Sequence, residues 1–318
     1  MSNVSKMKVA PRNADCEQLN HDYGAPERIV FRPSQHDAPI AVLANKYGVA
    51  EISLLGAQTI SYRPTGNQPV LYMPHPYDAR RVGTEIHGGI PVCWPWFAGN
   101  GPKGAPMHGL ARYGRWRVIA SEYSEDSTEL KLAYSSDEAT RAVWPHDFEL
   151  ELKVSVSMKL TLSLRATNTG DTPFEVTEGF HPYFLVSARD RTEVLGVDGC
   201  LFTDTNEPDK TGRVWTGAYE VRRGGSMIYD VSNYEYVLMD HGLRRAIAIV
   251  SRGNKRLVVW NPGEESAPNV AAFGVDGWRK FVCVEPCSTP RDVAYTLEPG
   301  KSHDLLIAVQ SVSEEYRR

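Results

Sequence analysis

Hydrophobic and polar side chains alternate strictly between residues 148 and 165. Every even-numbered position in this stretch is large and apolar, and every odd-numbered position is polar or charged. A period of two is typical of strands that bury one face and expose the other. Because the stretch is longer than a usual strand, we expect a tight turn near residues 157–159 that makes it a hairpin. Asn-Thr-Gly-Asp at 168–171 predicts the turn that ends the second strand.

Short β-like runs dominate the chain from about residue 29 onwards, and helical signal is thin. The runs rich in β-branched and other apolar residues lie at 50–62, 115–120, 246–250, 257–260, 279–284 and 304–312. Ser-Ser-Asp-Glu at 135–138 predicts a capped helix start, and Pro145 predicts its end after about two turns. We therefore expect one large antiparallel β domain over residues 25–318. Residues 1–24 have few large apolar groups, which predicts a loose N-terminal arm.

The composition is that of an ordinary globular protein, with 42% hydrophobic and 23% charged residues. A net charge of −4 gives no overall basic face, so nucleic acid is not an expected partner. No stretch approaches the roughly 18 apolar residues of a membrane span, and the first 16 residues lack the apolar core of a signal peptide. Five cysteines do not form a disulfide framework. We expect a cytoplasmic monomer with neither a membrane nor a nucleic acid as partner.

Three segments far apart in the chain each carry one proton-transferring side chain among glycine, proline or aromatic residues. They are His-Gly-Leu-Ala-Arg at 108–112, Gly-Phe-His-Pro-Tyr-Phe at 179–184 and Phe-Val-Cys-Val-Glu-Pro at 281–286. Two imidazoles and one carboxylate supply an acid, a base and an orienting partner, which is enough to open and close a sugar hemiacetal without a cofactor. Alternation places Glu285 on the same face as Phe281 and Cys283, where a carboxylate is costly unless it is paired.

The stretch 87–104 differs in kind, because glycine, proline and aromatic residues crowd together in it. Such a loop is stiff, and its glycines let the backbone approach a ligand closely, which is typical of a binding surface on a β protein. The alternative is a loop that only covers the core. Tryptophans that could stack on the apolar face of a sugar are Trp94, Trp96, Trp260 and Trp278, although tryptophan is more often a core residue.

As an ordered set, these segments resemble the aldose 1-epimerase superfamily, in particular its D-hexose-6-phosphate mutarotase branch. The matching pieces lie at 88–97, 108–112, 144–148, 181–184, 260–263 and 276–285, and the resemblance covers about residues 27–314. It implies an all-β fold, a large antiparallel β-sandwich of the galactose-mutarotase type, with the site on its concave face. It also implies a sugar or sugar phosphate as ligand and no cofactor.

The resemblance also implies roles for individual residues. The family's catalytic pair corresponds to His181 and Glu285, its second histidine to His108, and its basic substrate contact to Arg112. Asp204 resembles the family's hydroxyl-binding aspartate. Trp96 is a further candidate for substrate contact.

The chain departs from the family pattern where members of the phosphate branch usually have an arginine before the Gly-Gly-Ile-Pro run. Here the residue is His87. The change removes a fixed charge that would hold phosphate bidentately, so His87 is a candidate ligand contact and Arg81 or Arg80 a candidate replacement for the charge. The second departure is Pro182 where the family often has threonine or serine.

Mutarotation needs a base at the anomeric hydroxyl and an acid at the ring oxygen. Glu285 suits the base because a carboxylate is ionised at neutral pH, and His181 suits the acid because an imidazole has an ordinary pKa of about 6.5. We therefore expect interconversion of the α and β anomers of an aldohexose 6-phosphate, D-glucose 6-phosphate first.

Two alternatives stay open at this point: a mutarotase for unphosphorylated aldohexoses, and a non-catalytic carbohydrate-binding protein. A metal site is not expected, because no two histidines stand at the close spacing that metal sites favour. The chain contains no Gly-x-Ser-x-Gly elbow, no P-loop and no dinucleotide-binding fingerprint, which argues against hydrolase and nucleotide chemistry.

Overall fold

A nine-stranded antiparallel sheet forms the back layer of the protein, in the order β16-β13-β18-β19-β23-β9-β8-β7-β6. The computed structural model describes residues 12–34, 38–74, 85–207, 209, 211–231, 233–289 and 291–313. The strands of the large sheet are β6 (Arg117–Tyr123), β7 (Thr128–Ser135), β8 (Phe148–Val156), β9 (Leu160–Asn168), β13 (Thr192–Leu195), β16 (Tyr219–Glu220), β18 (Glu235–Asp240), β19 (Arg245–Arg252) and β23 (Ser302–Ser313).

The alternating stretch forms the predicted hairpin at the centre of this sheet. Val156 pairs with Leu160, and Ser157 N donates to Lys159 O across the turn at 2.9 Å. The even-numbered residues of β8 and β9 are buried, because they face the second layer of the sandwich. Met158 breaks the pattern with 67% exposure, since it sits at the tip of the turn and belongs to neither face.

Two further sheets form the front layer. The four-stranded sheet has the order β1-β2-β3-β4, and the eight-stranded sheet has the order β15-β14-β17-β20-β21-β11-β5, with β12 paired to β21. Their strands are β1 (Ile29–Arg32), β2 (Ile40–Asn45), β3 (Gly48–Ser53), β4 (Gln58–Pro64), β5 (Val92–Cys93), β11 (Gly179–Phe180), β12 (Tyr183–Leu185), β14 (Leu201–Asp204), β15 (Arg213–Val214), β17 (Gly225–Asp230), β20 (Arg256–Asn261) and β21 (Phe281–Cys287). A small sheet pairs β10 (Phe174–Val176) with β22 (Tyr295–Leu297).

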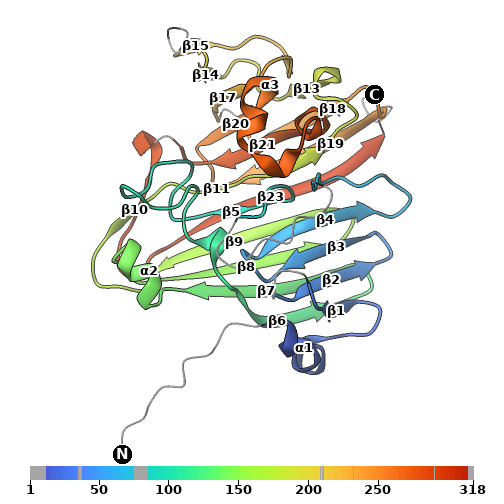
Figure 1. Ribbon diagram of the computed structural model, residues 1–318, viewed down its shortest axis with the longest axis vertical. Helices are drawn as coiled ribbons and strands as arrows, with labels where there is room; N and C mark the ends of the chain where they lie inside the picture. The colour runs from blue at the N-terminus through green and yellow to red at the C-terminus, as the bar shows by residue number, and fades with distance from the viewer. Residues whose placement is uncertain are drawn as a thin grey trace, which may run out of the picture.

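The two layers enclose one continuous apolar core. In Figure 1, β1–β4 lie over the β6–β9 end of the large sheet, and β2 contacts both β7 and β8. The eight-stranded sheet contributes Leu257, Val259, Val282 and Val284 to the same core, which also contains Ile247 and Leu305 of the large sheet. The prediction of an all-β antiparallel sandwich is therefore confirmed. The other face of β20 and β21 points away from the core and is free to carry a site.

The N-terminal region differs from the loose arm that we predicted over residues 1–24. Residues 1–11 lie outside the described chain, but a 3-10 turn, η1 (Asn13–Asp15), leads into helix α1 (Cys16–Tyr23). Leu19 packs into the main core, and the side-chain amide of Asn20 exchanges hydrogen bonds of 2.7 and 2.8 Å with the backbone of Phe31. Few apolar residues were enough to dock the helix because these polar contacts tie it to β1.

The predicted short helix is confirmed as α2 (Glu138–Val143), capped by Asp137. Asp137 Oδ1 accepts from Thr140 N at 2.8 Å, and Thr140 Oγ1 accepts from Asp137 N at 2.8 Å. The remaining helical segments are short connections: η2 (Ala111–Tyr113), η3 (Arg189–Arg191), α3 (Gly263–Ser266), η5 (Ala267–Asn269), η6 (Ala271–Phe273), η7 (Gly277–Lys280) and η8 (Arg291–Val293). None of the helices in the described ranges has the length and apolar character needed to cross a membrane.

Candidate active site

Strand β21 positions the carboxylate of Glu285. Val282 and Val284 point into the sandwich core, so alternation turns Cys283 and Glu285 to the opposite face of the sheet. Glu285 is nevertheless only 1% exposed, because neighbouring strands and the loop after β5 cover that face. It is therefore a buried carboxylate and not a strand end turned to solvent.

His181 lies between β11 and β12, beside β21. Its backbone N–H donates to Pro91 O at 3.1 Å, which anchors the segment to the loop before β5. The imidazole stacks on the Tyr183 ring at 4.8 Å with an interplanar angle of 11°. In this position His181 Nε2 lies 3.6 Å from Glu285 Oε2. Two segments more than 100 residues apart in the sequence thus place an acid and a base side by side.

Both groups open onto one cavity of about 440 Å³. This volume falls in the range of about 300–1,000 Å³ that is usual for small-molecule sites. Both apolar and polar side chains form the wall, and the His108 ring lies 5.1 Å from the His181 ring. The lining residues are Glu85, His87, Phe97, Ala98, Met107, His108, Arg112, His181, Tyr183, Ser226, Val258, Trp260, Val270 and Glu285.

His108 is held in one tautomer. Its backbone has a φ of +65°, and its backbone N–H donates a hydrogen bond to Ala98 O at 2.9 Å. In return Ala98 N donates to His108 Nδ1 at 3.1 Å, so the hydrogen of the neutral ring must sit on Nε2. Burial, followed by the charge of Arg112, lowers the pKa of His108 to about 3. His108 is therefore a neutral imidazole that offers a fixed N–H donor.

Arg112 supplies a buried positive charge. It lies in η2 and is 2% exposed, with one guanidinium nitrogen 3.4 Å from Ile86 O. Its Nε has no hydrogen-bond partner within the described residues. A buried guanidinium with an unused donor is costly unless a ligand or water satisfies it, which makes Arg112 a candidate ligand contact.

The environment shifts the two central groups in opposite directions. Burial raises the pKa of the Glu285 carboxyl well above its ordinary value, and the Arg112 charge only partly offsets this. Burial lowers the pKa of the His181 imidazole well below its ordinary value, and the positive charge of Arg112 acts in the same direction. A carboxylate with a raised pKa is a stronger base, and an imidazolium with a lowered pKa is a stronger acid. The site therefore strengthens a proton acceptor and a proton donor 3.6 Å apart.

His87 lies on the cavity wall with a partner that the sequence did not single out. His87 Nε2 is 3.1 Å from Glu85 Oε1, and the Tyr113 hydroxyl donates to Glu85 Oε2 at 2.6 Å. The hydrogen bond from His87 is the main reason that the pKa of Glu85 is lowered to about 2, despite partial burial. Glu85 is thus an ionised carboxylate at the cavity wall. The sequence offered one indication that Glu85 belongs to the site, namely its position just before the glycine-rich loop that begins at residue 87.

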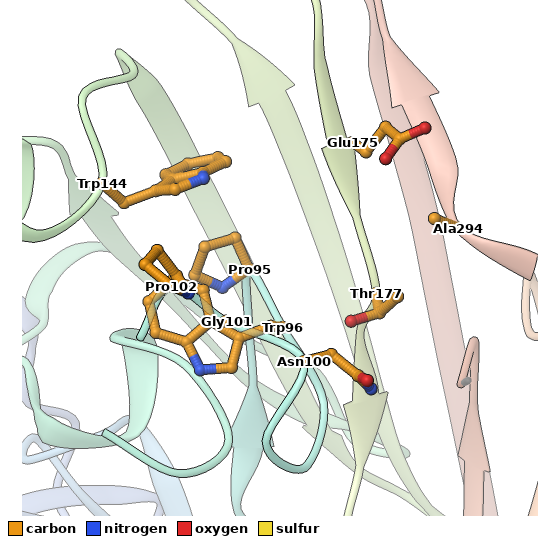
Figure 2. Close-up of a pocket in the computed structure, with 9 residues that line it drawn as sticks. All are labelled: Pro95, Trp96, Asn100, Gly101, Pro102, Trp144, Glu175, Thr177 and Ala294. Carbon is orange, nitrogen blue, oxygen red and sulfur yellow. The ribbon is translucent and has the colours of Figure 1, made fainter. Parts of the chain in front are cut away.

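Trp96 does not line this cavity, so the geometry does not support the predicted substrate contact there. Its indole N–H donates to Pro106 O at 2.8 Å. Figure 2 shows Trp96 and Trp144 in a separate pocket of about 140 Å³. Consecutive residues of the loop face opposite sides, so Phe97 faces the cavity in place of Trp96. Among the four candidate tryptophans, Trp260 lines the cavity.

Asp204 and Arg81 are not placed in the site either. The Asp204 carboxylate forms an ion pair with Arg223 and accepts a hydrogen bond from Asn206 N at 2.9 Å. It is buried on the strand next to Ser226, outside the residues that line the cavity, so its predicted hydroxyl contact is not supported. Arg81 and Arg80 fall at positions 75–84, outside the described residues.

Sequence reasoning missed several residues of the cavity wall, namely Glu85, Phe97, Ser226, Val258 and Val270. The register of the eight-stranded sheet explains two of them. Val258 lies directly opposite Glu285 on β20, and Ser226 lies opposite Trp260 on β17. Only the strand order reveals this proximity, because small apolar or hydroxyl residues carry no recognisable motif.

Comparison with known proteins agrees with this geometry. The family model described as aldose 1-epimerase matches residues 39–310. A Salmonella typhimurium protein named "putative glucose-6-phosphate 1-epimerase" is 30% identical over 259 residues, which cover 81% of this chain and 85% of that protein. An Escherichia coli protein of the same name is 29% identical, with 81% and 85% covered.

Solved structures give the same result. A crystal structure described as a "putative mutarotase" from Salmonella typhimurium superposes with a TM-score of 0.82 and 27% identity, covering 90% of this chain and 94% of that one. A galactose mutarotase-like protein from Clostridium acetobutylicum shares the fold with a TM-score of 0.70 at 16% identity, covering 90% and 98% of the two chains. With an acid and a base beside one sugar-sized cavity, and with a family match over most of its length, the chain belongs to the aldose 1-epimerase family and is an isomerase of that type.

Proposed function

We propose that this protein interconverts the α and β anomers of an aldohexose 6-phosphate, in the simplest case D-glucose 6-phosphate, without a cofactor. The observation that carries the proposal is the approach of the buried His181 Nε2 to the buried Glu285 Oε2 at 3.6 Å, at the wall of a cavity of about 440 Å³. The names of the two bacterial relatives support the phosphorylated substrate.

Glu285 and His181 divide the proton transfers between them. Glu285 takes the proton of the anomeric hydroxyl while the bond between C1 and the ring oxygen breaks. The electron pair of that bond passes to the ring oxygen, which receives a proton from His181. The open aldehyde turns about the C1–C2 bond and presents its other face. His181 then recovers the proton of the attacking hydroxyl, and Glu285 returns its proton to the former carbonyl oxygen, which restores both groups.

The other wall residues orient the sugar during these steps. The Nε2–H of His108 points a fixed donor at the cavity, and we assign it a hydrogen bond to a sugar oxygen near C1. Trp260 offers an aromatic face to the C–H groups of the pyranose. The unused donor of Arg112 would be satisfied by a hydroxyl or phosphate oxygen.

Glu85 favours a second candidate function, mutarotation of an unphosphorylated aldohexose. An ionised carboxylate on the cavity wall repels a phosphate dianion but accepts hydrogen bonds from sugar hydroxyls. Among the described residues of the wall, Arg112 carries the positive charge that can oppose it. The two candidate functions therefore differ in which group decides substrate binding: the positive charge of Arg112 favours a phosphorylated sugar, and the negative charge of Glu85 favours an unphosphorylated one.

Magnetisation-transfer NMR between the two anomeric protons tests the proposal directly. The purified protein should accelerate exchange for glucose 6-phosphate more than for glucose or galactose at equal concentration. A clear preference for the plain hexoses would reject the phosphorylated substrate and favour the second candidate. Unchanged exchange for all three sugars would reject the mutarotase mechanism.

The Glu285→Gln variant separates catalysis from binding. We expect it to lower the exchange rate by a factor on the order of 10²–10⁴, because the amide cannot accept the anomeric proton. Sugar affinity, measured by calorimetry, should be retained, since the amide side chain keeps the shape of the carboxylate and one of its hydrogen-bonding oxygens. A variant that keeps the wild-type rate would remove Glu285 from the mechanism.

A further inference from the structure

Cys283 is a buried thiol beside the acid and base that the sugar chemistry leaves unused. It lies two residues before Glu285 on the same face of β21 and is fully buried. The strand register places it opposite Tyr183 on one side and Trp260 on the other, so it forms part of the floor beneath the cavity. A thiol, an imidazole and a carboxylate are then direct neighbours.

The three groups are close enough to share one ion. A ring nitrogen of His181, the sulfur of Cys283 and a carboxylate oxygen of Glu285 all lie within 4.8 Å of one another. In a tetrahedral zinc site, bonds of about 2.0–2.3 Å leave neighbouring ligand atoms roughly 3.5 Å apart. The distance of 3.6 Å between His181 Nε2 and Glu285 Oε2 matches that spacing already. The Cys283 sulfur lies within 4.8 Å of the other two ligand atoms, so it needs to move by at most roughly 1 Å, which a small rotation about χ1 provides.

A second observation points to a missing ligand at the same place. Glu285 Oε1 is buried and has no hydrogen-bond partner in the described part of the chain. It belongs to the carboxylate whose other oxygen, Oε2, lies 3.6 Å from His181 Nε2. Buried polar atoms are normally satisfied by protein, water or an ion. Because His181 and Glu285 also line the cavity, a fourth coordination position would remain open to a water molecule.

We propose that His181, Cys283 and Glu285 form a site for Zn²⁺ or a similarly thiophilic divalent cation, and that the bound ion excludes the sugar. Mixed nitrogen, sulfur and oxygen ligands suit a borderline-soft ion, whereas Mg²⁺ and Ca²⁺ require more oxygen ligands than the site offers. The nearby Arg112 charge opposes any cation. A carboxylate together with a thiolate carries two negative charges, which outweigh that one positive charge.

Occupancy of the site stops the reaction. The ion would use the lone pairs of the same imidazole and carboxylate that must exchange protons with the sugar. It would also occupy the floor of the cavity beside His181 and Glu285. The site is therefore inhibitory, and the sugar and the ion should compete for it.

Cobalt offers a direct test on the whole chain, stripped of metal and in the absence of sugar. Co²⁺ should bind with one ion per chain and give the near-ultraviolet charge-transfer absorption of a thiolate ligand. Zn²⁺ should displace it, and Mg²⁺ should not. Saturating glucose 6-phosphate should suppress the absorption. A cobalt complex without the thiolate absorption would overturn the proposed site. An absorption that persists unchanged in a saturating sugar that calorimetry shows to bind the metal-free protein would overturn the proposed exclusion of the sugar.

A pair of cysteine variants locates the ligand. In Cys283→Ser, we expect the affinity for Zn²⁺ to fall by at least about 10–100-fold, the loss seen when weaker outer-shell contacts of a metal are removed. Cys287→Ser is the matched control, because Cys287 lies two residues beyond Glu285 on the same face but outside the three-residue cluster. Equal Zn²⁺ affinity in wild type and Cys283→Ser would overturn the proposal. If Cys283→Ser does not fold, the presence or absence of the thiolate charge-transfer absorption in the wild-type cobalt complex decides whether a cysteine is a ligand. Metal binding is measured here without turnover, so its failure would leave the proposed sugar chemistry unaffected.

Discussion

Burial makes the Glu285 carboxylate a stronger base and the His181 imidazolium a stronger acid than either would be in water. The cost is that neither group holds its charge easily. Arg112 limits this cost for Glu285, because its guanidinium is the group that lowers the raised pKa of the carboxyl. The same charge disfavours protonation of His181. Arg112 therefore sets the range of pH in which one proton is shared productively by the pair.

This role predicts a shift in the pH–rate profile of an Arg112→Met variant. In wild type, exchange should fall as the pH drops through the pKa of Glu285, and that limb should lie above the ordinary value of 4.5 because the pKa is raised. Without the guanidinium the pKa rises further, so the acid limb should move to higher pH. The profile of kcat/KM measures it. Arg117→Met, at a surface ion pair with Glu149, is the control and should leave the limb in place. An unmoved limb in Arg112→Met would contradict the assignment.

His108 acts as a neutral donor, so its removal should have a modest effect. His108→Phe deletes one hydrogen bond to the sugar, worth about 1 kcal/mol, and should lower kcat/KM by about five- to tenfold at all pH values above about 5. The pH profile should keep its shape, because a group with a pKa of about 3 does not titrate in that range. His146→Phe, outside the cavity, should retain wild-type kcat/KM. A changed profile in His108→Phe would show that His108 exchanges protons with the substrate.

Strand β21 serves the core with one face and the site with the other. Val284 is fully buried in the sandwich core, whereas its neighbour Glu285 faces the cavity. Val284→Ala should therefore lower the free energy of unfolding by about 2 kcal/mol, because two methyl groups leave a cavity. Its exchange rate per folded molecule should stay near that of wild type. Urea unfolding and NMR exchange on the same sample check both parts, and a large rate loss would mean that the two faces are coupled.

The elements with a clear period were predictable, and those defined by pairing were not. The alternation over 148–165 predicted β8, β9 and their turn, because burial of one face imposes a period of two. Strands such as β5 and β11 are two residues long and exist through their partners, so local sequence contains no signal for them. The helix α1 was missed for a similar reason, because its docking depends on Asn20 bonding to the backbone of β1.

The residues of the candidate site also fall into two groups, those that the sequence could predict and those that only the fold reveals. His181, Glu285, His108 and Arg112 could be predicted, since each is an unusual polar residue within an apolar or glycine-rich segment. Trp96 and Asp204 lie away from the cavity, and residue type alone does not say which side of a loop or strand a side chain faces. Their neighbours Phe97 and Ser226 line the cavity instead. Register and loop direction, which depend on the whole fold, decided between them.

At the scale of the whole molecule, the cavity draws its walls from residues between Glu85 and Glu285. These residues come from strands β12, β17, β20 and β21, from η2, and from the segments beside β5, between β11 and β12 and between η5 and η6. The four strands each contribute side chains to the shared core of the sandwich. A ligand in the cavity therefore contacts segments that separate when the domain unfolds. Binding should stabilise the domain as a unit, and stabilisation becomes a measure of which sugar the site prefers.

Thermal unfolding of the Glu285→Gln variant uses this coupling to compare substrates without turnover. A sugar at about 100 times its Kd should add about 2.7 kcal/mol to the free energy of unfolding. Each kcal/mol corresponds to roughly 2–4 °C in Tm for a domain of somewhat smaller size. At equal concentration, glucose 6-phosphate should raise Tm more than glucose, because the Arg112 guanidinium attracts the phosphate. Inorganic phosphate at the same ionic strength is the control for charge alone. If glucose gives the larger shift, the carboxylate of Glu85 governs selection, and the natural substrate is an unphosphorylated sugar.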